Sequence, residues 1–208
     1  MILNKEEKRI KMLLNKKKET TSEGWILTFA GKIFRPLAPR AEDICIEDIA
    51  HALSNMCRFN GHVSEFYSVA QHSVQVAKHT PAPFKLHALL HDASEAYIFD
   101  VPKPIKDKFF LFSLGKYLRY SVVEASIERV IFDKFDVKDY NYPVVKSYDI
   151  MAICTEVRDL MGSSVRAAQI SNYPVLNQDI RCFEETIVPL SPKEAEAEFL
   201  KMFRELTK

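Results

Sequence analysis

The segment HALLHDASEAYIFD, residues 87–100, constrains the fold of this 208-residue chain more than any other stretch. Apolar residues recur at helical spacing from just before it, namely Leu86, Leu89, Leu90 and Ala93. Residues three and four apart are neighbours on a helix, so His91, Asp92 and Glu95 share one side of it. The pattern predicts a buried helix that carries one cluster of polar side chains.

A second histidine lies upstream on another predicted helix. Val69, His72 and Val76 stand at positions i, i+3 and i+7, so His72 shares the apolar face. A buried imidazole without a partner is costly, which means that His72 needs one. Imidazoles and carboxylates are ligands for first-row divalent ions, and the two helices together predict a metal site. The alternative interpretation is two core histidines with ordinary hydrogen bonds and a surface carboxylate pair.

Two further carboxylates follow the predicted ligands. Glu95 and Asp100 lie close enough in sequence to handle the protons of water activated by a bound ion. The pattern therefore indicates a hydrolase.

Four segments together resemble a known family. YSVAQHS, HALLHDASEAYIFDVPKPIK and SYDIMAICTEVRDL resemble the motifs of HD-domain metal-dependent phosphohydrolases. CRFNGH, residues 57–62, is similar to the deoxynucleotide-cleaving branch, which includes 5'-deoxynucleotidases and phage dATP triphosphohydrolases. The resemblance covers about residues 43–160. It implies an all-α HD-domain helical bundle around one divalent transition metal ion (Co, Mn or Zn, with Mg as a further option).

The resemblance also implies roles for individual residues. The metal ligands would be His72, His91, Asp92 and Asp149, and the catalytic residues would be Glu95 and Asp100. Relatives often carry a glycine where Phe99 stands. With Phe99 the backbone next to Asp100 is less free to approach a phosphate.

The sequence supports Asp149 independently. Pro143 opens a predicted helix on which Asp149, Ala152, Ile153 and Glu156 form one stripe. Asp149 therefore points inward among apolar neighbours. Glu156 and Asp159 are rival candidates for the same role.

Substrate contacts are predicted around the motif CRFNGH and after Asp100. Arg58 can grip a phosphate with two parallel hydrogen bonds, and the ring of Phe59 can exclude a 2'-hydroxyl by shape. Lys103 and Lys106 supply positive charge for additional phosphates. The resemblance of the N-terminal segment and of CRFNGH to the phage-type proteins, together with these two lysines, implies hydrolysis of a deoxynucleotide at its 5'-phosphate, with dATP giving deoxyadenosine and triphosphate.

Other functions are compatible with the same residues. A dNMP 5'-nucleotidase would release orthophosphate, and a cyclic-nucleotide phosphodiesterase is a third enzyme class. An HD-type di-iron oxygenase would need more ligands, for which His79 and His87 are the nearby candidates. A catalytically silent nucleotide-binding protein would have no physical need for four ligands and Glu95 together.

Composition places limits on the partners. The chain has 29 basic and 28 acidic side chains and a net charge of +1, so no stable nucleic-acid partner is expected. No run of residues is apolar enough for a membrane span or a signal peptide, which predicts a cytoplasmic protein, in a bacterial host cell if phage-encoded. Cys45, Cys57, Cys154 and Cys182 are predicted to be reduced thiols. The expected partners are a small-molecule deoxynucleotide and further copies of the chain in a homo-oligomer.

The predicted organisation is a basic amphipathic N-terminal arm over residues 1–24 and a single domain over residues 25–208. A small β-hairpin is predicted at 25–34, around Ala30 and Gly31, and the first core helix from Asp43 to the breaker Asn60–Gly61. Arg58 then lies at a helix exit. Further helices are predicted over 116–135, over 143–161 and from the capping box at Ser191 onward, with 162–190 as connecting structure.

Overall fold

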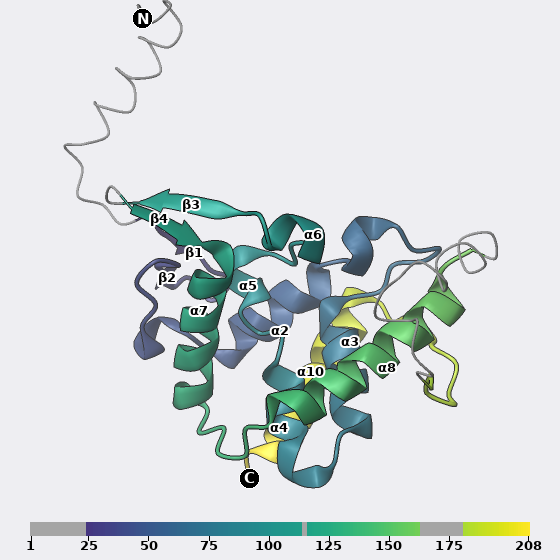
Figure 1. The fold of residues 1–208 in the computed structure, drawn as a ribbon. Coiled ribbons are helices and arrows are strands. Elements are labelled where there is room, and N and C mark those ends of the chain that lie inside the picture. The colour runs from purple at the N-terminus through teal and green to yellow at the C-terminus, as the bar shows by residue number, and fades with distance from the viewer. Residues whose placement is uncertain (1–23, 114–115, 163–180) are drawn as a thin grey trace, which may run out of the picture.

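The chain forms a mostly helical domain, as the sequence predicts (Figure 1). The computed structural model describes residues 24–113, 116–162 and 181–208, so most of the predicted N-terminal arm lies outside the described part. The α-helices are α2 (Ile46–Asn55), α3 (Val69–His79), α4 (Lys85–Leu90), α5 (Glu95–Ile98), α6 (Lys103–Lys106), α7 (Tyr120–Lys134), α8 (Tyr142–Leu160) and α10 (Pro192–Leu206). The 3-10 turns are η2 (Ala41–Asp43), η3 (Arg58–Gly61) and η4 (Ala82–Phe84).

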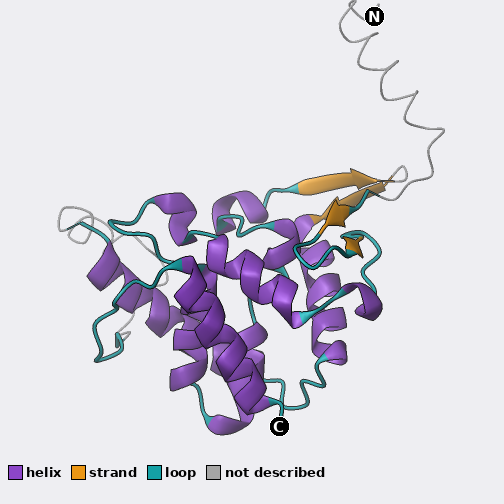
Figure 2. Cartoon of the chain, turned by 180° about the vertical axis from the view of Figure 1, so that it is seen from behind, coloured by secondary structure: helices purple, strands orange, loops and turns teal. Residues whose placement is uncertain are grey.

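Helix α3 lies at the centre of the bundle. It packs against α2, α4 and α10, and against α8 on the side that carries the polar cluster (Figures 1 and 2). Its residues Val69, Ala70, Val76 and Ala77 are fully buried. Burial of this apolar surface is the main force that fixes α3, and with it the position of His72.

The C-terminal helix α10 closes the core. Ser191 accepts a hydrogen bond from the backbone N–H of Glu194, whose side chain bonds back to the N–H of Ser191, so the predicted capping box is confirmed. Phe199 is then fully buried against the other helices.

No helix among the described residues is both long and apolar enough to cross a membrane.

Two short antiparallel hairpins flank the helices (Figure 1). Strands β1 (Ile26–Leu27) and β2 (Ile33–Phe34) confirm the hairpin predicted from the N-terminal part of the domain. The prediction of one helix over 116–135 is wrong at its start, because β3 (Phe110–Ser113) pairs with β4 (Lys116–Arg119) before α7 begins. Backbone pairing with a preceding strand overrides a helical pattern that is ambiguous over so few residues.

The first core helix is shorter than predicted. It begins at Ile46 and ends at Asn55, and the chain then pairs with the residue before α3 through the bridge between Cys57 and Ser68. Phe59 and Asn60 follow with φ values of 53° and 52°, in the left-handed region that a helix cannot continue through. Arg58 therefore lies on a tight turn, held beside α3 by its N–H bond to the carbonyl of Tyr67.

The predicted helix around His91 is divided in two. Helix α4 ends at Leu90 and α5 begins at Glu95, and the N–H groups of Ala93 and Glu95 bond to carbonyls three residues earlier instead of four. This tighter winding changes the direction in which the polar side chains project. His91 and Asp92 consequently lie on the turn between the two helices.

The prediction of four reduced cysteines is wrong for two of them. Cys154 on α8 and Cys182 form a disulfide, whereas Cys45 and Cys57 are free thiols. The segment after residue 180 packs back along α8 through bonds from Arg158 to the carbonyls of Phe183 and Glu185. The spacing of Cys154 and Cys182 in the sequence does not indicate this contact.

Thiol counting checks the disulfide. Protein purified without reductant and then denatured should expose two alkylatable cysteines, and reduction should raise the number to four. Cys154→Ser should lower the free energy of unfolding by about 3 kcal/mol, the range for a loop of this length. Cys57→Ser is the control and should leave the bridge intact. Four reactive thiols before reduction would contradict the pairing.

Candidate metal centre

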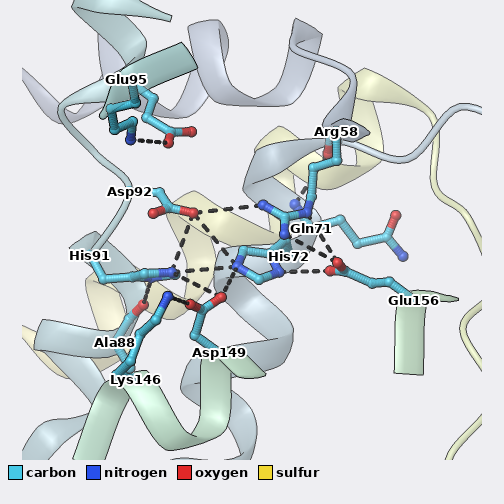
Figure 3. A network of polar contacts seen from close by, with 12 residues as sticks. Arg58, Gln71, His72, Ala88, His91, Asp92, Glu95, Lys146, Asp149 and Glu156 are labelled. Carbon is cyan, nitrogen blue, oxygen red and sulfur yellow. Dashed lines mark hydrogen bonds and ion pairs between the residues drawn. The ribbon is translucent and has the colours of Figure 1, made fainter. Parts of the chain in front are cut away.

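His72 lies on α3 and is fully buried. Its Nδ1 lies 2.6 Å from Oε1 of Glu156 on α8, a charge-assisted hydrogen bond in which the imidazole donates (Figure 3). In the neutral ring this bond leaves the lone pair on Nε2. Burial and Arg58 act to lower the pKa of His72, but Glu156 and Asp149 outweigh them and raise it to about 9, so a cation would bind Nε2 in place of a proton. A histidine held in this way by a carboxylate is the usual arrangement of a metal ligand.

His91 is prepared in the same manner. Its Nδ1 donates to the carbonyl oxygen of Ala88 at 2.7 Å, so Nε2 again carries the lone pair. The two Nε2 atoms lie 3.4 Å apart and face each other. Two nitrogen ligands of one tetrahedral ion are separated by about 3.3 Å when each bond is about 2.0–2.1 Å long, so the histidine pair fits such an ion.

Two carboxylates complete the cluster. Oδ2 of Asp92 lies 3.2 Å from Nε2 of His91, and Oδ1 of Asp149 lies 3.2 Å from Nε2 of His72 (Figure 3). His72, His91 and Asp92 form a group that could hold a metal ion, and the structure adds Asp149 on α8 to its edge. Two imidazoles with two carboxylates suit first-row divalent ions such as Zn, Co or Mn.

The charge balance of the cluster keeps its carboxylates ionised. Burial by itself raises the pKa of Asp92, but His91 and His72 outweigh it and hold this pKa below its usual range. Asp149 behaves alike: burial raises its pKa, and the bond to His72 together with His91 and Lys146 lowers it well below the usual range. Both carboxylates are therefore ionised at neutral pH opposite the protonated ring of His72, and a bound cation would take the place of its Nε2 proton.

Arg58 does not stand free for a substrate phosphate. Its Nε and one terminal nitrogen bond to Oε2 of Glu156 at 3.2 and 3.1 Å, and its other terminal nitrogen lies 3.7 Å from Asp92. Arg58 thus neutralises the carboxylate that orients His72. Sequence reasoning weighed Glu156 as a rival ligand, and the structure makes it the partner of a ligand instead.

Glu95 lies at the start of α5, buried beside the cluster. Burial and the nearby charges of Asp92 and Asp100 raise its pKa well above the usual value. Its Oε1 is 3.9 Å from Nζ of Lys106, and its Oε2 has no hydrogen-bond partner in the described part of the chain. A buried carboxylate with an unused oxygen is suited to accept a proton.

Asp100 and Phe99 follow α5. Burial raises the pKa of Asp100, and Phe99 is 74% exposed with φ 70° and ψ 155°. This backbone conformation is almost confined to glycine, so Phe99 adopts it at a cost. Phe99 therefore strains the turn that precedes Asp100.

A cavity of about 210 Å³ opens beside the cluster. It is lined by His87, His91, Asp92, Ser94, Lys106, Ser121, Glu124, Ala125, Glu128, Tyr142, Val145, Lys146 and Asp149. The predicted substrate residues Arg58, Phe59 and Lys103 are outside this lining. Lys106 does reach the cavity, but it is paired with Glu124.

Phe59 and Lys103 keep their roles only as predictions. The ring of Phe59 lies under the guanidinium of Arg58, 5.3 Å from its central carbon, and Lys103 is exposed at the start of α6. Sequence reasoning missed Lys146, which pairs with Asp149 from three residues earlier on α8. The i, i+3 spacing of a lysine and a buried aspartate was the available signal.

The two spare histidines lie away from the ligand positions. His79 bonds to Gln75 and Glu185 and stacks on Phe183, and His87 bonds to the backbone of Asn141. Neither belongs to the group of ligand atoms found among the described residues.

Comparison with known proteins places the chain among relatives. It is 38% identical over 183 residues to the uncharacterized protein YfdR of Escherichia coli (strain K12), covering 88% of this chain and 96% of YfdR. The chain belongs to the YfdR family. An uncharacterized protein of Rhodobacter capsulatus, RCAP_rcc00048, is 40% identical over 91 residues, covering 39% of this chain and 46% of that relative. No protein-family model matches the chain.

The role assigned to Glu156 in this member of the YfdR family can be tested. Glu156→Gln should lower the affinity for Zn or Co by about 10- to 100-fold, because the neutral amide orients His72 less well. Titration calorimetry of metal-free protein measures this affinity. Glu205→Gln, at an exposed position of α10, removes the same charge and should have no effect. Equal affinity for Glu156→Gln and the control would contradict the orienting role.

Proposed function

We propose that this protein hydrolyses deoxynucleotides at the 5'-phosphate in a metal-dependent reaction, with dATP as the preferred substrate. The observation that carries the proposal is the convergence of two oriented imidazole Nε2 atoms and two anionic carboxylates next to buried Glu95. The resemblance of the motifs around these residues to the deoxynucleotide-cleaving HD-domain phosphohydrolases supports the choice of reaction.

His72, His91, Asp92 and Asp149 would hold the ion. A divalent ion bound there would lower the pKa of water and withdraw charge from a phosphate oxygen. The unused oxygen of Glu95 is the site to which the attacking water would lose its proton. Asp100, protonated more readily than a usual aspartate because of its burial, would return a proton to the leaving 5'-oxygen.

The reaction balances for the preferred substrate. Water adds to the α-phosphorus, the bond from that phosphorus to the 5'-oxygen breaks, and the 5'-oxygen takes up a proton. The products are deoxyadenosine and intact triphosphate. With a dNMP, the same steps would release orthophosphate.

The cations near the ligands are compatible with an anionic substrate. Lys106 and Lys146 both line the cavity, from α6 and α8. Each is paired with a carboxylate, Glu124 and Asp149 respectively, so neither contributes a full unpaired charge. Because Lys106 lines the cavity and the exposed Lys103 does not, Lys106 is the better candidate of the two for contact with a phosphate.

A substrate panel tests the proposal. Metal-loaded protein is incubated with dAMP, dATP, dGTP, dTTP, dCTP and ATP, and the products are resolved by phosphorus NMR and chromatography. We expect deoxyadenosine and triphosphate from dATP, with ATP cleaved more slowly. Orthophosphate from dAMP with dATP intact would establish the nucleotidase instead. A metal-loaded protein that cleaves none of the six would contradict the proposal.

The role of Glu95 has its own test. Glu95→Gln should retain the metal and lower kcat by about 10²- to 10⁴-fold, the range for a lost general base. Glu205→Gln on the surface of α10 should keep full activity. Loss of the metal from Glu95→Gln would show that Glu95 is a ligand, and unchanged kcat would remove it from the mechanism.

A further inference from the structure

The cavity beside the ligands is lined by two chemically different groups of residues. One group is His91, Asp92 and Asp149, where the proposed reaction takes place. The other is His87 from α4, Glu124 and Glu128 from α7, and Tyr142 at the start of α8. The second group plays no part in the chemistry proposed above.

His87 carries an unused donor beside this cavity. It is 1% exposed, and its Nδ1 accepts a hydrogen bond from the backbone N–H of Asn141 at 3.3 Å. Burial, with a smaller effect of His91, lowers its pKa to about 4, so the ring is neutral and its proton resides on Nε2. Nε2 has no hydrogen-bond partner among the described residues. An unpaired buried donor is costly, and a ligand acceptor would remove that cost.

The orientation of His87 is fixed by its surroundings. Its ring stacks on Tyr140 with centroids 4.6 Å apart and meets the edge of Phe132 at 5.2 Å. The same tautomer prevents His87 from binding a metal, since Nε2 carries a proton. The group that would pair with Nε2 of His87 is therefore a hydrogen-bond acceptor.

Two acceptors line the same cavity. Glu124 and Glu128 are one turn apart on α7 and so share a face of the helix. Burial and the charge of Glu124 raise the pKa of Glu128 to about 7. No hydrogen bond or ion pair joins Glu128 to another described side chain, whereas Glu124 is paired with Lys106. In its ionised form, which predominates above about pH 7, Glu128 accepts hydrogen bonds from N–H donors and repels a carbonyl oxygen.

Tyr142 contributes a flat surface at the mouth of the cavity. Its side chain is 56% exposed although it belongs to the lining. Base–aromatic stacking on such a ring adds to affinity whatever the base. One donor, the unpaired acceptor Glu128 and a stacking ring match the polar edge and the face of a planar heterocycle.

We propose that His87, Glu128 and Tyr142 bind the nucleobase of the substrate and select bases that carry an exocyclic amino group. His87 donates to an acceptor of the base, and Glu128 accepts from the amino group. Adenine, guanine and cytosine offer both kinds of group, whereas hypoxanthine, uracil and thymine lack the amine. The inference rests on the proposed function for the position of the phosphate beside the metal ligands.

Matched pairs of substrates test the selection. The ratio of kcat/KM for dATP over dITP, and for dCTP over dUTP, should be about 10- to 100-fold, because the carbonyl analogue leaves a buried acceptor unpaired. Glu128→Gln presents an amide that can also donate, so it should reduce both ratios to near one, mainly through KM. Asp133→Asn, exposed on the same helix, is the control and should keep the ratios.

A second variant removes the donor. His87→Phe keeps a ring between Tyr140 and Phe132 and should lower kcat/KM for the amino-bearing substrates about tenfold. If it fails to fold, Glu128→Gln alone decides. Ratios near one in the unaltered protein, or ratios that Glu128→Gln leaves unchanged, would overturn the inference. A preference for substrates that lack the 3'-hydroxyl, with no preference among the bases, would overturn it as well.

Binding without hydrolysis separates this inference from the proposed function. Deoxyadenosine and deoxyinosine, and likewise deoxycytidine and deoxyuridine, are titrated into the protein by calorimetry. Tighter binding of the amino-bearing nucleosides that is lost in Glu128→Gln would support the base site even if no nucleotide were cleaved. Hydrolysis of several deoxynucleotides with no preference among the bases would support only the proposed function.

Discussion

The buried hydrogen bond between His72 and Glu156 is the interaction on which the rest of the candidate site depends. It joins α3 to α8 across 84 residues of sequence and decides which ring nitrogen of His72 faces the cluster. A lone glutamate at 0% exposure would be strongly destabilising, and Arg58 compensates its charge with two hydrogen bonds. The turn at Cys57–Gly61 thus serves the site by positioning a cation.

Packing and polarity are arranged as two layers around α3. The faces of α3 that meet α2, α4 and α10 are apolar and provide the stability of the bundle. The face toward α8 carries His72, whose partners Glu156 and Asp149 both lie on α8. Glu95 and His87, on neighbouring elements, each leave one buried polar atom unpaired, as do Ser54, Tyr67, Ser73 and Tyr97 among the described residues. Unpaired buried atoms beside a cavity are where a ligand has most to contribute.

The break after Leu90 explains why Glu95 and His87 lie around the same group of charged side chains. A continuous helix would place Glu95 one turn beyond His91 on the same side. The tighter turn at residues 91–94 instead gives His91 and Asp92 to the ligand cluster and Glu95 to a buried position above it (Figure 3). His87, one turn before His91, remains on α4 and faces the cavity. This short irregularity of the backbone therefore separates the proposed metal ligands His91 and Asp92 from the proposed general base Glu95. His87, the proposed nucleobase contact, lies on the helix before it.

The sequence by itself determined the helical class, the N-terminal hairpin, the capping box of α10 and the inward direction of His72 and Asp149, because these depend on local periodicity and capping. Only the tertiary structure decided the rest. The partner of Arg58, the role of Glu156, the cavity lined by His87 and Glu128, and the disulfide of Cys154 all join segments distant in sequence. The second hairpin is local, but its second strand also fits the start of a helix, so the sequence pattern left the choice open. Hydrophobic periodicity reports which face of a helix is buried, but not which side chain of another helix it meets.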